Sequence, residues 1–345
     1  MASDHLIPTI PASEGQMIKV GAEGVQEKGG ILHHSGGFRP LWLRDAGRKP
    51  RLILLTDISS SMISRLSLTV LADNNTLIDR YFTAEPGLSF LIQTEGKKIL
   101  FDTGYSEVFL SNGMKMGIDL RDLDSVVLSH GHLDHTWGLV PLVRLLTEAI
   151  IEDMPHKVPE LVAHPLCFCP KEKLPLRTIG SLLDEAEVRR QFRANLSAKP
   201  AWITDDLVFF GEIPRRFPFE QVDPGKRKIL LPDGRTEPDR LMDDSALAYR
   251  SEKGLVIITG CSHAGICNIT EYAREVCDER TVVCIIGGLH LINPPVAQLR
   301  GTGTYLRDLN LESLHACHCT SFASRLALAE FCPVQDTGVG LTLEW

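Results

Sequence analysis

No segment of this 345-residue chain is apolar over the length that a membrane-spanning helix requires. The N-terminus also lacks the order of basic and then apolar residues that marks a secretory signal. An excess of positive charge is missing as well, because the formal net charge is -8 and the pI is near 5.9. General binders of nucleic acid or of anionic membranes need clustered Lys and Arg. We therefore expect a cytoplasmic protein that binds neither nucleic acid nor membranes.

A regular cysteine framework is absent, although the chain contains nine cysteines. Scattered cysteines in a chain of this size are typical of reduced thiols and not of disulfides. Two Cys-x-Cys pairs could lend a thiolate to a metal, but buried apolar packing is the more common use of such pairs. The pairs are Cys167/Cys169 and Cys317/Cys319. Strand alternation predicts that the second pair points away from the face that His318 uses.

Internal repeats and low-complexity tracts are absent too, and the composition is that of an ordinary globular protein. With 43% hydrophobic and 23% charged residues, the chain can build one large domain or two smaller ones. Residues 1–65 differ from the rest because they carry glycine pairs and prolines with little periodicity. We interpret residues 1–65 as an N-terminal extension that is irregular or partly disordered, with His33 and His34 in a solvated loop. A translation start at Met62 is the alternative.

Strands and helices alternate from residue 66 to residue 345, which we interpret as one domain. Residues 88–102 predict a hairpin, and residues 124–163 predict a β-α-β unit. This order predicts an α/β (α+β) fold in which two mixed β-sheets are sandwiched between helices. The segment 214–239 is rich in proline and charge, and we expect it to be a long loop that acts as a lid.

The most informative segment is His130-Gly-His132-Leu-Asp134-His135, at the end of a predicted strand. Residues two apart in an extended chain point the same way, so His130 and His132 can bind one ion. Asp134 and His135 enter a helix and can face a second ion. Four such groups this close together would repel or compete without a cation among them. Imidazole and carboxylate ligands suit zinc, iron, manganese or nickel, so the segment predicts a metal centre.

Further ligands should follow later strands, because one loop cannot enclose two ions. His263 follows an apolar strand and a glycine-containing turn, and His318 ends a strand before a helix, so both are candidate ligands. His290 follows a glycine pair and could contact substrate, act as an acid or base, or bind metal. Asp102 is expected to accept a hydrogen bond from the distal N–H of a metal-binding histidine, which would fix the tautomer of that ring.

Four other polar residues are weaker candidates. His164 could be a ligand, although a histidine at a strand end is more often a satisfied surface or core group. His315 is expected to be structural. Asp243 and Asp244 could offer oxygen ligands, but an exposed turn is the expected setting for both.

The order of these motifs resembles the metallo-β-lactamase superfamily, whose fold is a four-layer αβ/βα sandwich with a dinuclear site between two sheets. Residues 66–345 carry the resemblance in four segments, which are Phe101–Gly104, His130–His135, Thr259–His263 and His318. Segments 73–76, 85–89, 260–266, 287–291 and 318–320 are similar to the subgroup named 7,8-dihydropterin-6-methyl-4-(β-D-ribofuranosyl)aminobenzene 5′-phosphate synthase. Two features depart from the superfamily pattern. A Gly-His-x-x-Gly segment is missing between His164 and Ser262, and Cys261 stands where the bridging aspartate is usual.

The resemblance implies an enzyme, a metal-dependent hydrolase or transferase that acts on a phosphorylated small molecule. Two divalent metal ions are expected, with zinc favoured over iron, manganese or magnesium. Their expected ligands are His130, His132, Asp134, His135, His263 and His318. Asp134 and His290 are the expected catalytic residues.

Candidate substrate contacts are Asn75, Gly288 and Arg80. Other cations that could meet an anionic substrate are Lys97, Lys98, Arg215, Arg216 and the run Lys226-Arg227-Lys228. Two other classes of protein stay open, namely a diiron redox protein of the same fold and a non-catalytic metal-binding sensor. A homo-oligomer is compatible with the sequence.

Overall fold

The computed structural model of the chain describes residues 66–221 and 223–345. These residues belong to the second of two compact units, which begins at Ser60. The expectations for the N-terminal extension, for His33 and His34, and for a start at Met62 lie outside the described residues. No helix in the described part of the chain is long and apolar enough to cross a membrane.

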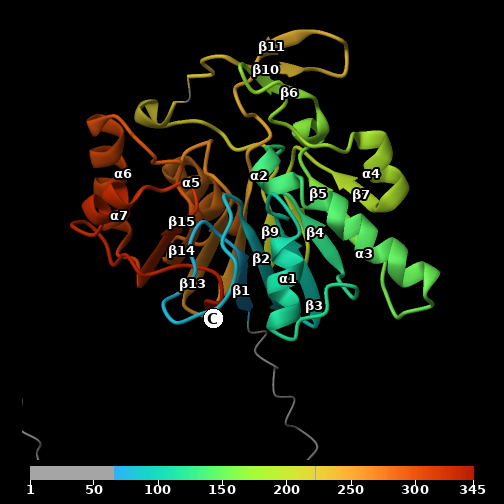
Figure 1. Cartoon of the computed structure of the whole chain (residues 1–345). Helices are drawn as coiled ribbons and strands as arrows, with labels where there is room; N and C mark the ends of the chain where they lie inside the picture. The colour runs from blue at the N-terminus through green and yellow to red at the C-terminus, as the bar shows by residue number, and fades with distance from the viewer. Residues whose placement is uncertain (1–65, 222) are drawn as a thin grey trace, which may run out of the picture. The chain divides into compact units, whose positions relative to one another are not determined.

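The first large sheet has seven strands in the order β16-β1-β2-β3-β4-β5-β7 (Figure 1). Neighbours from β16 to β3 are antiparallel, and neighbours from β3 to β7 are parallel. The predicted hairpin is formed by β2 and β3, whose two turn residues Glu95 and Gly96 both have positive φ, as tight hairpin turns require. The strands are β1 (Ser67–Ala72), β2 (Ser89–Thr94), β3 (Lys97–Phe101), β4 (Ser125–Val127), β5 (Glu160–Ala163), β7 (Arg193–Leu196) and β16 (Thr342–Glu344).

The second large sheet has six strands in the order β15-β14-β13-β12-β9-β8. Strands β13, β14 and β15 run parallel, whereas β12, β9 and β8 are antiparallel to their neighbours. The strands are β8 (Ala201–Trp202), β9 (Leu207–Phe209), β12 (Ala246–Ser251), β13 (Gly254–Thr259), β14 (Val282–Gly288) and β15 (Ser313–Cys317). Each large sheet of the described residues is therefore mixed, as predicted.

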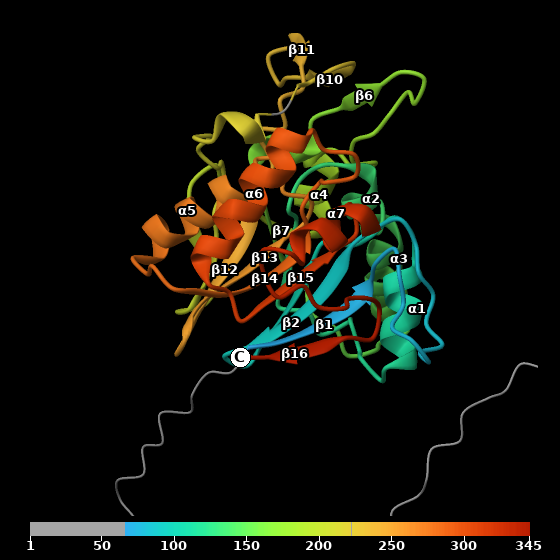
Figure 2. The same ribbon diagram turned by 90° about the vertical axis from the view of Figure 1, so that its left-hand side faces the viewer.

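Helices cover the outer face of each sheet (Figures 1 and 2). Helices α1, α3 and α4 share a core with the seven-stranded sheet, and α5, α6 and α7 share another with the six-stranded sheet. The short helix α2 follows β4. The helices are α1 (Val108–Lys115), α2 (Leu133–Thr136), α3 (Leu139–Ile151), α4 (Glu185–Gln191), α5 (Ile266–Cys277), α6 (Val296–Leu309) and α7 (Phe322–Leu328).

Three hydrophobic cores separate the four layers. Phe90 of β2 and Ile258 of β13 lie in the core between the two sheets. The next residue along β2, Leu91, packs on the outer face with Leu142 of α3, and Ile257 of β13 packs on the other outer face. Successive strand residues point to opposite faces, and because both faces are buried these strands are almost continuously apolar. The αβ/βα sandwich that the sequence predicts is confirmed.

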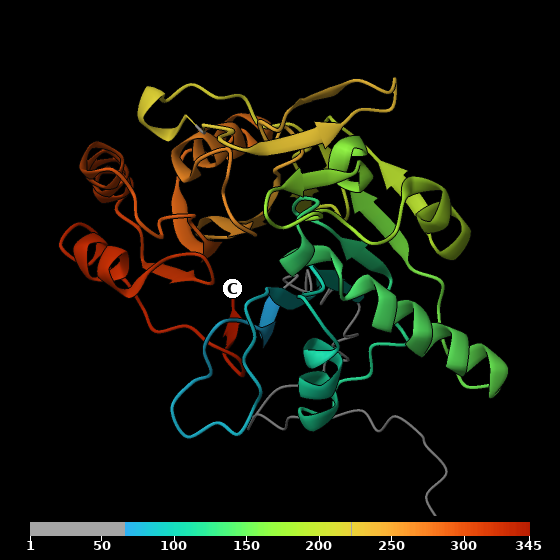
Figure 3. The same ribbon diagram turned by 45° about the horizontal axis from the view of Figure 1, so that its top comes forward.

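The segment after β9 is not the simple loop that the sequence predicts. It contains a short 3-10 helix (Pro218–Glu220) and two strands, β10 (Arg227–Leu230) and β11 (Thr236–Pro238). Strand β10 pairs with β11 and with β6 (Lys171–Lys173) to form a small antiparallel sheet, which we call the cap. The cap lies at the same end of the two large sheets as α2 (Figures 1 and 3). The sequence concealed these strands because they are short and mostly exposed, and only Ile229 of β10 is buried.

Candidate metal centre

The candidate ligands lie at the carboxyl ends of parallel strands from both large sheets. In the seven-stranded sheet, β3 ends before Asp102 and β4 ends before the loop of His130. In the six-stranded sheet, β13, β14 and β15 end before Cys261, His290 and His318. Parallel neighbours end at the same edge of a sheet, so these side chains converge although they are far apart in the sequence.

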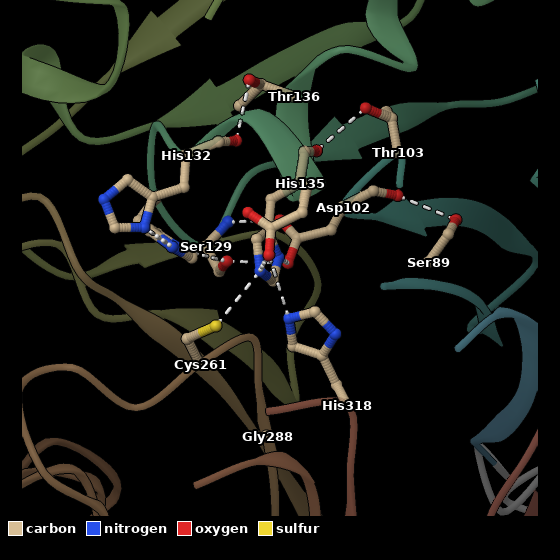
Figure 4. A network of polar contacts seen from close by, with 12 residues as sticks. Ser89, Asp102, Thr103, Ser129, His132, His135, Thr136, Cys261, Gly288 and His318 are labelled. Carbon is tan, nitrogen blue, oxygen red and sulfur yellow. Dashed lines mark hydrogen bonds and ion pairs between the residues drawn. The ribbon is translucent and has the colours of Figure 1, made fainter. Parts of the chain in front are cut away.

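The predicted metal segment turns from an extended backbone into α2. His132 is extended, with φ of -74° and ψ of 154°, and the helix begins at Leu133. Two hydroxyl groups hold the turn, because Thr136 Oγ1 donates to the carbonyl of His132 and Thr103 Oγ1 donates to the carbonyl of His135, each at 2.9 Å (Figure 4). The motif histidines are therefore fixed by backbone contacts on both sides of the turn.

Three histidines form the first group of converging donors. His130 Nε2 lies 3.0 Å from His132 Nδ1, and His263 Nε2 lies 3.2 Å from the same atom. Burial lowers the pKa of His132 to about 3 and holds the pKa of His130 and His263 well below the usual range, so all three rings are neutral. Three neutral imidazoles cannot all donate to one another, but each can offer a lone pair to one cation. The donor set therefore fits a divalent ion such as zinc.

The second group joins Asp134, His135 and His318. The rings of His135 and His318 face each other in Figure 4. Asp134 Oδ2 lies 3.4 Å from His318 Nε2 and 3.8 Å from His135 Nε2. Burial opposes ionisation of Asp134, but the two histidines outweigh it and lower the pKa of this carboxyl. Nε2 of His318 is buried and has no hydrogen-bond partner among the described residues, as expected of an atom aimed at a ligand.

Two cysteines that the predicted ligand set omits lie at this second group. Cys261 Sγ is 3.2 Å from His135 Nε2, and it shares a cluster with His318 and Cys319 in which all donor atoms lie within 4.8 Å of one another. The expectation that Cys319 points away from the His318 face is wrong. The reason is that β15 ends at Cys317 and His318 has a positive φ of 51°, so the strand alternation stops before Cys319. The sequence contained one signal for a cysteine at this site, because Cys261 stands where the superfamily usually has an aspartate.

Asp102 has the contacts expected of a residue that orients a metal-binding histidine. Its Oδ2 lies 2.7 Å from His135 Nδ1, and its carboxylate accepts hydrogen bonds from the backbone N–H and the hydroxyl of Ser129, each at 2.7 Å. His135 Nδ1 therefore carries the proton, and Nε2 is left to face Asp134 and Cys261. Burial opposes a charge on His135, but Asp102 and Asp134 raise its pKa overall.

Residues of both groups line a pocket of ≈ 230 Å³. They are His132, Asp134, Cys261, His263 and Cys319, and His290 lines the pocket with them. The ring of His290 lies 4.3 Å from the ring of His263, and burial lowers its pKa to about 4. Apolar side chains line the rest of the wall, and they are Leu133, Leu176, Ile179 and Ile292.

Two cations of the cap complete the pocket. Lys173 of β6 and Arg227 of β10 both line it. Arg227 Nη2 donates to the carbonyl of Asp223 at 2.9 Å, whereas its buried Nε has no hydrogen-bond partner within the described ranges. The guanidinium in the pocket lining therefore keeps at least one donor, Nε, without a partner among the residues described.

The predicted substrate contacts have different surroundings. Gly288 lies beside the second group, because a Cβ built on it would be 2.6 Å from Cys319 Sγ. Asn75 accepts from Val339 through its backbone, and Arg80 is exposed; neither lines the pocket. Asn74 contacts the site instead, since its Oδ1 lies 3.0 Å from His318 Nδ1. The roles of Asn75, Gly288 and Arg80 stay predictions.

Asp243 and Asp244 are buried, so the expectation of an exposed turn is wrong for both. Asp243 Oδ2 accepts from the backbone N–H of Gly131 at 2.8 Å and lies 3.0 Å from Lys171 Nζ, and Asp244 accepts from the N–H of Ala264 at 2.7 Å. These carboxylates hold the loops that carry His130 and His263. The sequence concealed them because their partners are distant backbone groups.

The remaining candidates lie outside both groups. His164 accepts from the backbone N–H of Leu166, and His315 is buried beside Thr337. Most of the other candidate cations have partners elsewhere. Lys97 donates to Ile203 O, Lys98 pairs with Asp122, Arg215 donates to Leu241 O, Arg216 pairs with Glu275, and Lys228 lies near Glu172.

An αβ/βα sandwich with histidines, a carboxylate and cysteines gathered at one edge of its two sheets defines a class of metal-binding proteins. The profile of the Metallo-beta-lactamase superfamily matches residues 82–274, and the chain belongs to this superfamily. Its members typically bind divalent metal ions, and the two groups of donors described above could hold them.

Comparison with known proteins gives the same family. The chain is 30% identical over 78% of its length to the 7,8-dihydropterin-6-methyl-4-(beta-D-ribofuranosyl)-aminobenzene-5'-phosphate synthase of Methanocaldococcus jannaschii, of which 92% is covered. It is 28% identical over 76% of its length to an uncharacterized protein of the same organism, of which 94% is covered. The solved structure of Tm1679, a metal-dependent hydrolase of the beta-lactamase superfamily, superposes with a TM-score of 0.67 at 28% identity and covers 81% of this chain and 98% of its own.

Proposed function

We propose that this protein is a metal-dependent enzyme that hydrolyses a phosphorylated small molecule or transfers a group from it. One observation carries the proposal: residues of both donor groups line a pocket that Arg227 and Lys173 also line. A phosphate in this pocket would meet these two cations as well as the bound metal. The name of the M. jannaschii relative supports a substrate that joins a flat ring to a phosphate.

Two sets of residues would hold two metal ions. His130, His132 and His263 hold one ion, and Asp134, His135 and His318 hold the second. A divalent ion at such a site supplies Lewis acidity, which makes a nucleophile available near neutral pH and offsets the charge that develops on a phosphate.

The pocket wall would position the substrate. The open donors of Arg227 bind phosphate oxygens, and the apolar wall receives a flat ring. His290 is neutral, so one of its ring nitrogens can accept a hydrogen bond or a proton from the substrate.

Metal content and two paired assays test this proposal. The purified protein is analysed for bound metals and is then assayed with a generic phosphodiester for hydrolysis and with a pterin diphosphate for group transfer. Turnover of either probe supports the proposal and decides between the two reactions. Absence of turnover in a fully metal-loaded sample favours a non-catalytic sensor, and iron-dependent oxygen consumption favours the redox alternative.

We expect His132→Ala to lose metal, because His132 Nδ1 is the atom on which His130 and His263 converge. Metal content per chain measures this effect. His156→Ala is the matched control, since His156 is exposed and contacts only a carbonyl of its own loop. Full metal content in His132→Ala would contradict the assignment.

We expect Arg227→Met to raise KM for a phosphorylated substrate by about 10- to 100-fold, the range for the loss of a hydrogen bond to a charged group. The fold should be unchanged, because only one hydrogen bond joins the guanidinium to the described residues. Lys228→Met is the control, since Lys228 is the exposed neighbour on the same strand. Equal KM values for both variants would argue against a phosphate at the cap.

A further inference from the structure

We propose that Cys261 and Cys319 bind metal as thiolates together with His318, so that the second position of the centre is a mixed sulfur and nitrogen site. This inference rests on the metal centre of the proposed function but not on turnover. It adds two ligands that the motif histidines and Asp134 do not supply.

The geometry of the three donors is the first support. Cys261 follows β13, and His318 and Cys319 follow β15, so the ends of two strands of one sheet bring them together. Their donor atoms all lie within 4.8 Å of one another. Cys261 Sγ also lies 3.2 Å from His135 Nε2, which connects this cluster to the histidines of the other sheet (Figure 4).

The surroundings of the two thiols differ from those of most other cysteines. Six cysteines belong to the three hydrophobic cores, where they act as small apolar side chains. Cys261 and Cys319 instead line the pocket among polar groups. The backbone N–H of His290 points at Cys319 Sγ from 3.2 Å, which favours negative charge on that sulfur. The thiol of Cys319 points at the carbonyl oxygen of Cys261 from 3.7 Å, which is a weak contact, so the two thiols gain little from their surroundings without a cation.

The backbone is shaped to make room for these sulfurs. Ser262 and His318 have positive φ values of 57° and 51°, which turn the chain beside each cysteine. At Gly288 a Cβ would lie 2.6 Å from Cys319 Sγ, so a side chain at this position would displace the thiol. Strained non-glycine residues persist where the surrounding structure holds them in place, and they cluster at functional sites.

The ligand set identifies the class of metal. Thiolate with imidazole favours zinc or iron, whereas magnesium and manganese prefer oxygen ligands. We therefore expect the second position to select zinc or iron over magnesium. Each thiol must lose its proton to solvent when the ion binds.

Substitution with cobalt(II) tests the inference without any assay of activity. The full chain, cleared of metal and reloaded with cobalt(II), should show a sulfur-to-metal charge-transfer absorption in the near ultraviolet. Cys261→Ser and Cys319→Ser should each weaken this band and reduce the content of bound metal. Cys317→Ala is the matched control, because Cys317 ends β15 two residues before Cys319 and its thiol lies in the central core. This variant should keep the band.

A measurement on the unmodified chain tests the inference even if the cysteine variants do not fold. X-ray absorption of the zinc-loaded protein should show sulfur at about 2.3 Å from zinc. Two bound metals with only nitrogen and oxygen neighbours would overturn the inference, and so would a disulfide between Cys261 and Cys319 in the metal-loaded protein. Turnover in a protein without metal-bound sulfur would leave the proposed function standing. Metal-bound sulfur without turnover would support this inference and contradict that function.

Discussion

Four of the ten non-glycine residues with positive φ in the described part of the chain lie at or beside the centre. Asp102, Ser262, His290 and His318 follow four different strands, and each has a φ between 49° and 57°. This conformation costs about 1 to 3 kcal/mol per residue for a non-glycine side chain. The fold bears this cost at the strand ends, where the turn directs a carboxylate, a neighbouring thiol or an imidazole toward the centre. Such residues are invisible in a sequence pattern, since no side chain type requires the conformation.

Asp102 supports a prediction at this scale. We expect Asp102→Asn to lower metal affinity about 10- to 100-fold, because the amide no longer offers His135 Nδ1 the same charged acceptor. Competition with a chelator of known affinity measures the change. Asp124→Asn serves as control, since Asp124 pairs with Lys157 on the surface. Similar affinities for both variants would show that Asp102 does not orient a ligand.

At the scale of elements, parallel strands explain how the centre is assembled. Strands β3 and β4 of one sheet and β13 to β15 of the other deliver their carboxyl ends to one place. The cap adds β6 and β10, which bring Lys173 and Arg227 over the pocket. The sequence analysis predicted a loop where β10 lies and no strand where β6 lies. Short exposed strands lack the apolar pattern that would reveal them.

Close approach of strand ends gives a prediction at the scale of elements. A Cβ on Gly288 would lie 2.5 Å from the carbonyl oxygen of Gly260 and 2.6 Å from Cys319 Sγ. We expect Gly288→Ala to push β14 away from its neighbours, lower the melting temperature and reduce metal content. Gly113→Ala in α1 is the control, because its nearest contact would be 3.5 Å and alanine is the better helix former. A variant at Gly288 with normal melting and metal content would refute the steric argument.

At the scale of the whole molecule, one buried ion pair links distant parts of the chain. Lys171 of β6 pairs with Asp243, and Asp243 also accepts from the N–H of Gly131 in the motif loop. Both charged side chains are fully buried. Lys171 Nζ donates to the carbonyl of Leu166 at 2.7 Å as well. The pair therefore connects the cap, the motif loop and the segment before β12.

We expect Lys171→Met to lower the free energy of unfolding by about 3 to 5 kcal/mol, because it leaves Asp243 buried without its cation. Urea denaturation followed by fluorescence measures the loss. Lys199→Met is the control, since Lys199 is exposed. A loss no larger than in the control would show that the pair does not stabilise the fold.

The charges of the wild-type pair should persist over a wide range of pH. Lys171 lowers the pKa of Asp243 from its ordinary 3.8, and Asp243 raises the pKa of Lys171 from 10.5, each against the opposing effect of burial. The carboxylate contributes stability above 3.8 and loses it as the pH falls through its lowered pKa. The ammonium contributes below 10.5 and loses it as the pH rises through its raised pKa. Between about pH 5 and pH 9 both groups of the wild-type pair stay charged, so the contribution of the pair to the stability of the wild type should be constant.

The central part of this protein could be predicted from its sequence because the relevant signals are local. Apolar runs buried on both faces define the strands, and the His130 to His135 segment carries its candidate ligands within one turn. The order of motifs along the chain was enough for the family and the four-layer fold. The family match and the superposition on Tm1679 confirm that much.

What only the tertiary structure decided depends on contacts between residues distant in the sequence. Asp243 is buried because Lys171 and Gly131 come to it, and Cys319 faces Cys261 because the strand ends at Cys317 and His318 turns the chain. The sequence by itself determined which residue types are available to bind a metal. Packing of the two sheets decided which of them share a site, because distance and burial are properties of the folded chain.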